Sequence, residues 1–262
     1  MKKLTRLLAL LLVLTLLLTA VCYAAQRNPE DNPDDNPGEN PEDNPGENPD
    51  DNPGENPDEN PEDKPDENPD DNPDDEEQTF VYPDDWSHDA MVFVAENGIM
   101  AGDENNDLKP KDNMTRAQMA AVLVRLLAAT KTGDISAYTD ALPDAWYYSE
   151  LSTAYAIGVF NGVSKTLMQP NAPITREQTA VVLCRAFGIV SEERSAYQKF
   201  TDGEKVMGYA RDAVSAMVTL NVVRGYEDNS FRPGGYITRA EVAQMIFNFF
   251  DALIDYPAAL PK

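Results

Sequence analysis

Apolar residues recur along the chain at the spacing of helix faces. After Tyr209 they fall at every third or fourth position, which gathers them into one stripe along a helix. The members of this stripe are Ala210, Ala213, Val214, Met217 and Val218. Related stripes follow Trp86 and Trp146, and a second set with the same period lies in the segments that begin at Met114 and Ile237. The pattern predicts helices in pairs and therefore an all-α fold.

The second helix of each pair carries a capping signal at its start. A Thr followed three positions later by Gln or Glu can form a capping box, in which each side chain accepts a hydrogen bond from the backbone amide of the other residue. The three pairs are Thr115 with Gln118, Thr175 with Gln178, and Thr238 with Glu241. Each Thr is expected to begin a helix.

The same features repeat at a nearly constant interval. The three capped starts are 60 and 63 residues apart, and an aromatic residue, a Gly and a Pro keep the same offsets. These sets are Trp86, Trp146 and Tyr209; Gly102, Gly162 and Gly225; and Pro110, Pro170 and Pro233. The chain therefore contains three homologous helix-loop-helix units, at residues 78–130, 136–190 and 198–253. Two helices cannot bury both stripes alone, so the units are expected to share one core around an approximate threefold axis.

The loops inside the units begin at Gly102, Gly162 and Gly225, directly after the apolar end of the first helix. This is the place for a glycine cap with positive φ, and we expect these residues to end the helices. The first loop, GDENNDLKP, is rich in acidic and amide side chains but too short for a calcium loop. We predict turns here and no metal site.

An arginine follows each capping Thr, and this choice is unfavourable for a helix. Arg116, Arg176 and Arg239 place a cation in the first turn, where the helix dipole already contributes about half a positive charge. One hypothesis is that each Arg and the free amides beside it face an anion. The alternative is that each Arg pairs with a carboxylate of a neighbouring repeat.

The order Phe-x-Asp, Trp, Gly-(Ile/Val), Gly, Phe-x-Pro and Ile-Thr-Arg-Ala-Glu, in three tandem copies over residues 78–253, resembles the S-layer homology (SLH) domain. The resemblance implies a pseudo-trimer with a central helical bundle. It further implies non-covalent anchoring to the bacterial cell wall, through secondary cell-wall polysaccharide, commonly pyruvylated, bound in grooves between adjacent copies. In that family the signature Arg is associated with the acidic sugar.

The resemblance nominates ligand-binding residues in all three copies. They are Arg116, Arg176 and Arg239; Trp86, Trp146 and Tyr209; Gly102, Gly162 and Gly225; and Asp140 and Asp202, which match the Asp of the Phe-x-Asp motif. The aromatic residues either offer flat apolar faces to sugar rings or are ordinary core residues. The first two copies read TRAQ and TREQ and the third reads TRAE, so the grooves are expected to differ, with Arg239 the strongest candidate.

The first 25 residues have the pattern of a secretory signal peptide, with Lys2, Lys3 and Arg6 before an apolar run and small residues at Ala20, Cys22 and Ala24. An uncleaved membrane anchor is the alternative. Residues 26–77 form an Asn-Pro-Asp/Glu linker, with 23 acidic residues against one Lys in 28–77, and are predicted to be disordered. Residues 254–262 are a C-terminal tail. We expect a secreted protein at the cell wall or in the S-layer.

Several functions are disfavoured by the composition. The net charge is −25, so nucleic acid is a poor partner. The single His88 has no catalytic partner nearby in sequence, and Cys184 falls in a helix stripe where a buried core residue is expected. We predict no enzyme activity and no cofactor. The second hypothesis for function is a structural surface-layer or envelope-tethering protein that works through protein contacts, with the N-terminus kept in the membrane.

Overall fold

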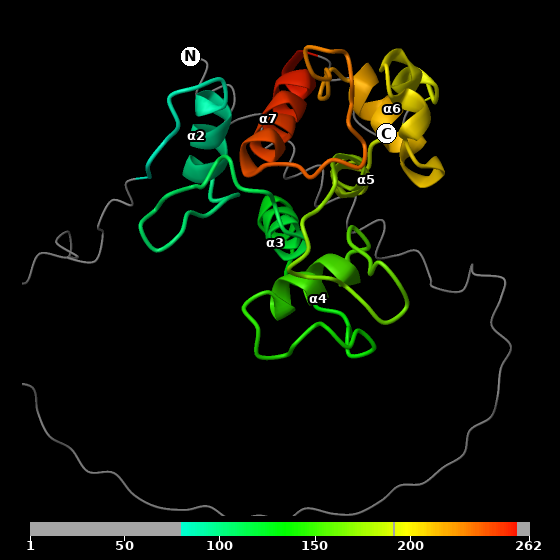
Figure 1. Cartoon of the computed structure of the whole chain (residues 1–262). Helices are drawn as coiled ribbons and strands as arrows, with labels where there is room; N and C mark the ends of the chain where they lie inside the picture. The colour runs from blue at the N-terminus through cyan, green and yellow to red at the C-terminus, as the bar shows by residue number, and fades with distance from the viewer. Residues whose placement is uncertain (1–79, 191, 256–262) are drawn as a thin grey trace, which may run out of the picture. The chain divides into compact units, whose positions relative to one another are not determined.

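The computed structural model describes residues 80–190 and 192–255; the predicted signal peptide and acidic linker lie outside them. This part of the chain is all-α, as predicted, with six α-helices and no strand (Figure 1). The helices are α2 (His88–Glu96), α3 (Arg116–Leu126), α4 (Tyr148–Ala156), α5 (Arg176–Phe187), α6 (Arg211–Thr219) and α7 (Arg239–Asp255). Three short 3-10 helices precede α6, at Ala196–Lys199, Gly203–Lys205 and Gly208–Ala210.

The three predicted capping boxes are confirmed. The hydroxyl groups of Thr115 and Thr175 accept hydrogen bonds from the amides of Gln118 and Gln178, and both Gln side chains accept from the Thr amides. At the start of α7 the amide of Thr238 donates to the Glu241 carboxylate at 2.9 Å, and the Glu241 amide donates to the Thr hydroxyl at 3.2 Å. Each box therefore begins the second helix of a repeat.

The helices pair between repeats. The first helix of each repeat packs against the capped helix of another: α2 against α7, α4 against α3, and α6 against α5 (Figure 1). On α2, Ala90, Met91 and Val94 are fully buried by this arrangement. The pairing is cyclic, so the three repeats share one core as the stripes predicted.

A ring of three backbone hydrogen bonds lies where the repeats meet. The amide of Met114 donates to the carbonyl of Ile237, that of Ile237 to Ile174, and that of Ile174 to Met114, at 2.8, 3.2 and 2.9 Å. All three side chains are fully buried. Each precedes a capping Thr, so the ring holds the starts of α3, α5 and α7 together.

The prediction that Gly102, Gly162 and Gly225 cap the first helices is wrong. The residues that follow these helices with positive φ are Gly98, Gly158 and Asn221, which stand four residues earlier in each repeat. Gly225 does have a positive φ, of 87°, but lies beyond the end of α6. The helices end sooner than their apolar pattern suggested.

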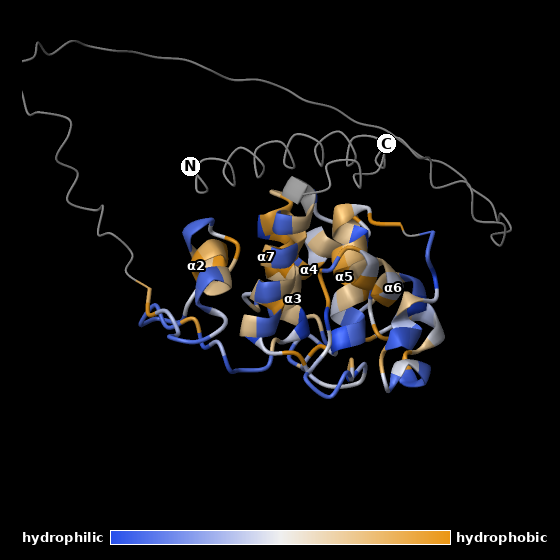
Figure 2. Cartoon of the chain, turned by 90° about the horizontal axis from the view of Figure 1, so that it is seen from above, coloured by the Kyte–Doolittle hydropathy of each residue, from blue (hydrophilic) through white to orange (hydrophobic). Residues whose placement is uncertain are grey.

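Close packing is the reason for glycine at two of those loop positions. A Cβ on Gly102 would lie 2.7 Å from the carbonyl carbon of Asn106, and one on Gly162 would overlap with the ring of Tyr138. Figure 2 shows the contrast between these loops, which are mostly hydrophilic, and the helices, which carry the apolar residues. The loops thus form the polar surface on which a site can be built.

Candidate functional site

The first-turn amides of the capped helices are not free. The amides of Arg116 and Ala117 donate to the carbonyls of Ala172 and Pro170, both at 2.9 Å. The other two helices repeat this pattern: Arg176 and Glu177 donate to Gly235 and Pro233, and Arg239 and Ala240 donate to Asp112 and Pro110. The hypothesis that the amides and the Arg jointly face an anion is therefore wrong for the amides. Their hydrogen bonds join each capped helix to the turn that begins at the loop proline of a neighbouring repeat.

The three signature guanidinium groups are buried, with 6 to 8% of each residue exposed. Arg116 donates from Nε to the Met168 carbonyl at 2.8 Å and from Nη2 to Asn161 at 2.9 Å. Arg239 repeats this with Leu108 and Ala101, at 2.7 and 2.6 Å. Burial lowers the pKa of both Arg116 and Arg239. The two side chains thus connect one repeat to the loop of the next.

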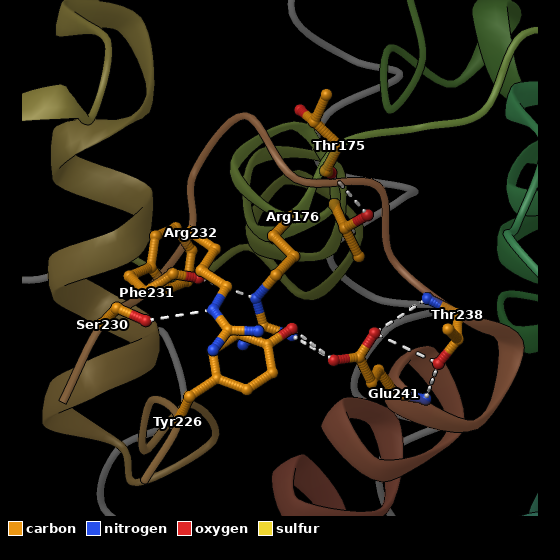
Figure 3. A network of polar contacts seen from close by, with 9 residues as sticks. Thr175, Arg176, Tyr226, Ser230, Phe231, Arg232, Thr238 and Glu241 are labelled. Atoms are coloured by element: carbon orange, nitrogen blue, oxygen red, sulfur yellow. Dashed lines mark hydrogen bonds and ion pairs between the residues drawn. The ribbon is translucent and has the colours of Figure 1, made fainter. Parts of the chain in front are cut away.

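The carboxylate alternative holds for Arg176. Its Nε donates to the Phe231 carbonyl at 2.9 Å, and its Nη1 forms an ion pair with Glu241 at 3.1 Å (Figure 3). Glu241 is the capping-box residue of α7, and the other two boxes have a neutral Gln at this place. Arg116 and Arg239 form no ion pair with a residue that the structure describes. The repeats therefore differ in how they use the same Arg.

Tyr226 extends the polar network around Arg176. Its hydroxyl donates to Glu241, and the guanidinium groups of Arg176 and Arg232 lie 4.6 and 3.9 Å from its ring centroid (Figure 3). Burial, followed by the hydrogen bond to Glu241, raises the pKa of Tyr226 to about 12. The tyrosine is therefore neutral at physiological pH and offers an electron-rich face to both cations.

The three repeat aromatics are surface residues. Trp86, Trp146 and Tyr209 are 63, 60 and 57% exposed. The alternative that they are core residues is wrong, because more than half of each residue is exposed. An exposed indole is free to meet a ligand.

Both tryptophans lie at pockets that also contain a signature Arg. Pocket A, of about 410 Å³, is lined by Trp86, Arg176, Gly225 and Glu241 among others. Pocket B, of about 440 Å³, includes Trp146, Arg239, Gly102 and Gln118. Each pocket takes its aromatic, its Arg and its loop from three different repeats. Volumes of this size suit a small ligand or a few sugar rings.

Pocket B leaves part of Arg239 accessible. The Nη1 atom of Arg239 donates to no described residue, and no buried side-chain nitrogen or oxygen in the described part of the chain lacks a partner. Solvent therefore reaches Nη1. In pocket A the corresponding Arg176 has its charge paired with Glu241.

Asp140 and Asp202 hold the loops in place. The Asp140 carboxylate accepts hydrogen bonds from the amides of Met168 and Gln169, at 2.8 and 2.7 Å. Asp202 does the same for Phe231 and Arg232, at 2.7 and 2.8 Å. The carbonyls of Met168 and Phe231 are the acceptors of Arg116 and Arg176. Both Asp residues thus position the loop segment that receives the neighbouring Arg.

The third aromatic, Tyr209, has a partner of its own. Its hydroxyl donates to Glu177 Oε1 at 2.9 Å, and the amide of Met207 donates to Glu177 Oε2 at 3.0 Å. Burial, then the bond to Glu177, raises the pKa of Tyr209 to about 12. Glu177 stands where the other repeats have Ala117 and Ala240. By the repeat order of pockets A and B, a third groove is expected at Arg116, Gly162 and Tyr209, and it would carry this buried carboxylate beside its aromatic residue.

Two exposed arginines at the pockets were missed by the sequence analysis. Arg125, in the last turn of α3, lines pocket B, and Arg224, after α6, lines pocket A. Arg125 lies on the polar side of its helix and Arg224 lies in the loop after α6, so neither belongs to an apolar stripe or to a motif that the sequence analysis singled out. The available signal was the repeat alignment, in which Arg224 corresponds to Ala101 and Asn161.

The remaining candidates are one thiol and one imidazole. Cys184 is buried as predicted, and burial raises its pKa to about 12. His88 is exposed, with Nδ1 2.9 Å from the Pro83 carbonyl. Within residues 80–190 and 192–255 there is no cluster of metal-ligating side chains, and no helix has the length and hydropathy to span a bilayer. The predicted signal peptide or membrane anchor lies outside these residues.

Comparison with known proteins agrees with the repeat structure. The family model of the S-layer homology domain matches residues 81–120, 137–180 and 199–243. The Surface-layer 125 kDa protein of Lysinibacillus sphaericus is 29% identical over 68% of this chain and 15% of its own length. An Amylopullulanase of Thermoanaerobacterium thermosulfurigenes is 29% identical over 64% of this chain and 9% of its own length. The S-layer protein sap of Bacillus anthracis is 24% identical over 62% of this chain and 20% of its own length. The matched region is thus a small part of each relative.

Proposed function

This chain belongs to the S-layer homology family, with three domains in tandem across residues 81–243, and we propose that it attaches non-covalently to secondary cell-wall polysaccharide. The family and the surface-layer names of two relatives imply a location at the cell surface or wall. The proposal adds the ligand: a polysaccharide that carries carboxylates, such as pyruvate ketals. It is a binding function and includes no catalytic step.

The observation that carries the proposal is the composition of pockets A and B. Each combines an exposed Trp with an Arg from another repeat, in a space of about 410 or 440 Å³. An indole face can cover the C–H groups of a sugar ring, while a guanidinium group donates to a carboxylate. A neutral apolar ligand would not require an arginine in either pocket. An acidic saccharide would use both the Trp and the Arg.

Two pockets on one rigid body also suit a polymer. A repeating polysaccharide that enters one pocket presents further acidic sugars near the other, which raises their effective concentration. Two individually weak sites then hold the chain at the wall. This multivalence supports a polymer over a free monosaccharide as the ligand.

The test is co-sedimentation of the chain with purified walls of the bacterium that encodes it, before and after chemical removal of the secondary polysaccharide. We expect binding to the native walls and loss of binding to the stripped walls. Trp86→Ala and Trp146→Ala should each weaken binding, and the double variant should weaken it most. Tyr236→Ala is the matched control, because Tyr236 is 57% exposed and is not part of the described lining of pocket A or B.

Undiminished binding to stripped walls would reject the polysaccharide as the ligand. It would favour the second hypothesis, a structural protein that binds other proteins. Equal binding by the double tryptophan variant and the control would place the contact outside the two pockets. Because the altered side chains are exposed, the variants should have the same thermal transition as the unaltered chain. This comparison excludes misfolding as the cause of a loss of wall binding.

A further inference from the structure

The signature arginines are poorly placed to be the main contact for an anion. Arg239 is buried, and its Nε and Nη2 donate to the carbonyls of Leu108 and Ala101. Arg176 is buried as well, and its charge is paired with Glu241. Bidentate binding of a carboxylate needs two parallel N–H donors on one guanidinium group. In each of these two side chains, two of the three guanidinium nitrogens already donate inside the protein.

Each pocket has a second Arg whose side chain is exposed. Arg224 lines pocket A and Arg125 lines pocket B. Neither forms an ion pair with a residue that the structure describes. In pocket B the positive charge of Arg125 also acts on Arg239 and, behind burial, lowers its pKa. Two like charges therefore face one space, which an anion would stabilise.

Both pockets contain an exposed Arg, but the two arginines come from different positions in the repeat. At the place of Arg224 the first repeat has Ala101, and at the place of Arg125 the third repeat has Asn248. Pocket A therefore receives its exposed Arg from the loop, and pocket B receives its own from the helix. If the exposed Arg stabilised the fold, we would expect it at the same position in both pockets. The two pockets share the positive charge but not its position, which favours a role in binding a ligand.

We propose that Arg224 and Arg125 are the side chains that bind the carboxylate of the polysaccharide in pockets A and B. This inference rests on the proposed function and names the residues that carry its selectivity for acidic sugars. The buried Arg176 and Arg239 then serve as positioning residues, which hold the loops that form the pocket walls. Trp86 in pocket A and Trp146 in pocket B contact the sugar beside its acidic group.

The two pockets differ in their balance of charge. In pocket A, Arg176 is offset by Glu241, so Arg224 leaves one net positive charge. Pocket B also contains Asp103, Asp107 and Asp112. Lys109 pairs with Asp103 and Asp107 at 3.1 and 2.9 Å but offsets only one of their two charges, so the three carboxylates balance Lys109 and the two arginines and pocket B is neutral. Pocket A is therefore expected to be the tighter site for an anion.

The test is isothermal titration of the full chain with polysaccharide released from the same walls, in native form and with its carboxylates chemically reduced to alcohols. For the native polymer, Arg224→Ala and Arg125→Ala should each weaken binding about tenfold or more, the loss of one charge-assisted contact, with the larger effect at Arg224. Arg194→Ala is the charge-matched control, because Arg194 is exposed, lines neither pocket and makes only a surface ion pair with Asp212. It should bind like the unaltered chain.

The carboxyl-reduced polymer separates charge recognition from other roles. It should bind the unaltered chain weakly, and Arg224→Ala and Arg125→Ala should cause little further loss. The inference is overturned if the native polymer binds both variants as it binds the control, or if the variants lose as much affinity for the reduced polymer as for the native one. In either case binding by the unaltered chain would leave the proposed function standing. If the unaltered chain does not bind the native polymer, the proposed function itself fails.

Discussion

Arginine in the first turn of a helix is locally unfavourable, and its acceptors explain why it recurs here. Arg116, Arg176 and Arg239 donate from Nε to the carbonyls of Met168, Phe231 and Leu108. Each acceptor belongs to the loop of another repeat. A guanidinium group is long, planar and rich in donors, so one side chain can satisfy two loop carbonyls. The residue therefore has a structural role whether or not a ligand is bound.

Replacement of Arg239 by Ala should destabilise the fold. It removes hydrogen bonds of 2.7 and 2.6 Å and leaves the carbonyls of Leu108 and Ala101 without this donor. We expect the free energy of unfolding to fall by about 2–4 kcal/mol, the usual cost of unpaired buried polar groups. Urea denaturation measures it. Arg125→Ala serves as the control, with a change within about 0.5 kcal/mol because the side chain is exposed.

An unchanged free energy of unfolding in Arg239→Ala, together with lost wall binding, would contradict this assignment. It would return Arg239 to the role that the sequence suggested, a direct ligand contact. Arg239→Lys adds a second comparison, because lysine keeps the charge but lacks the planar fork. It should recover little of the lost stability if the two carbonyls are the reason for arginine.

The capped helix starts were predictable because their bonds are local. Thr115 and Gln118 are three residues apart, and the chemistry of the pair fixes its geometry. The burial of the arginines was not predictable in this way. Arg116 and its acceptor Met168 are 52 residues apart, and Arg239 and Leu108 are 131 apart. The sequence also offered two glycines near the end of each of the first two helices, and only the structure shows which one has positive φ.

The three capped helices, α3, α5 and α7, differ most clearly at the start of α5. Glu177 receives the Tyr209 hydroxyl and the Met207 amide, whereas α3 and α7 have Ala117 and Ala240 at this position. The carboxylate is buried. It ties the third repeat's aromatic residue to the second repeat, and its negative charge opposes an acidic sugar in the groove of Arg116. This groove is expected to be closed to the polysaccharide.

Glu177→Ala should open the third groove. The change removes the partner of Tyr209 and the negative charge together, so titration with the native polysaccharide should show one more ligand bound per chain. Glu177→Gln keeps an acceptor for Tyr209 without the charge, and it separates the two causes. An extra ligand in the Gln variant would assign the closure to charge. An extra ligand in the Ala variant alone would assign it to the hydrogen bond, and no extra ligand in either variant would refute the closure.

At the scale of the whole molecule, the repeat boundaries in sequence do not coincide with the packing units. The repeats read as three helix-loop-helix modules, but each first helix is buried by the capped helix of another module. Phe93 of α2 lies 5.6 and 5.3 Å, between ring centroids, from Phe247 and Phe250 of α7. The sequence predicted a shared core from unburied stripes, yet the cyclic order of the pairs could not be derived from periodicity, which carries no information about distant partners.

The cyclic order of helix pairs predicts that the three repeats fold and unfold together. Removal of residues 199–262 would expose Phe93 and the buried face of α2, deprive α5 of α6, and break the ring at Ile237. A fragment that ends at residue 198 still holds two complete repeats by sequence. If each repeat stabilised itself, this fragment would melt as sharply as the full chain. Because the partner helices are lost, we expect it to lack a cooperative thermal transition and to exchange its amide hydrogens rapidly. Circular dichroism and hydrogen exchange measure these properties, and a fragment with a sharp transition and protected amides in α2 would show that the repeats are independent after all.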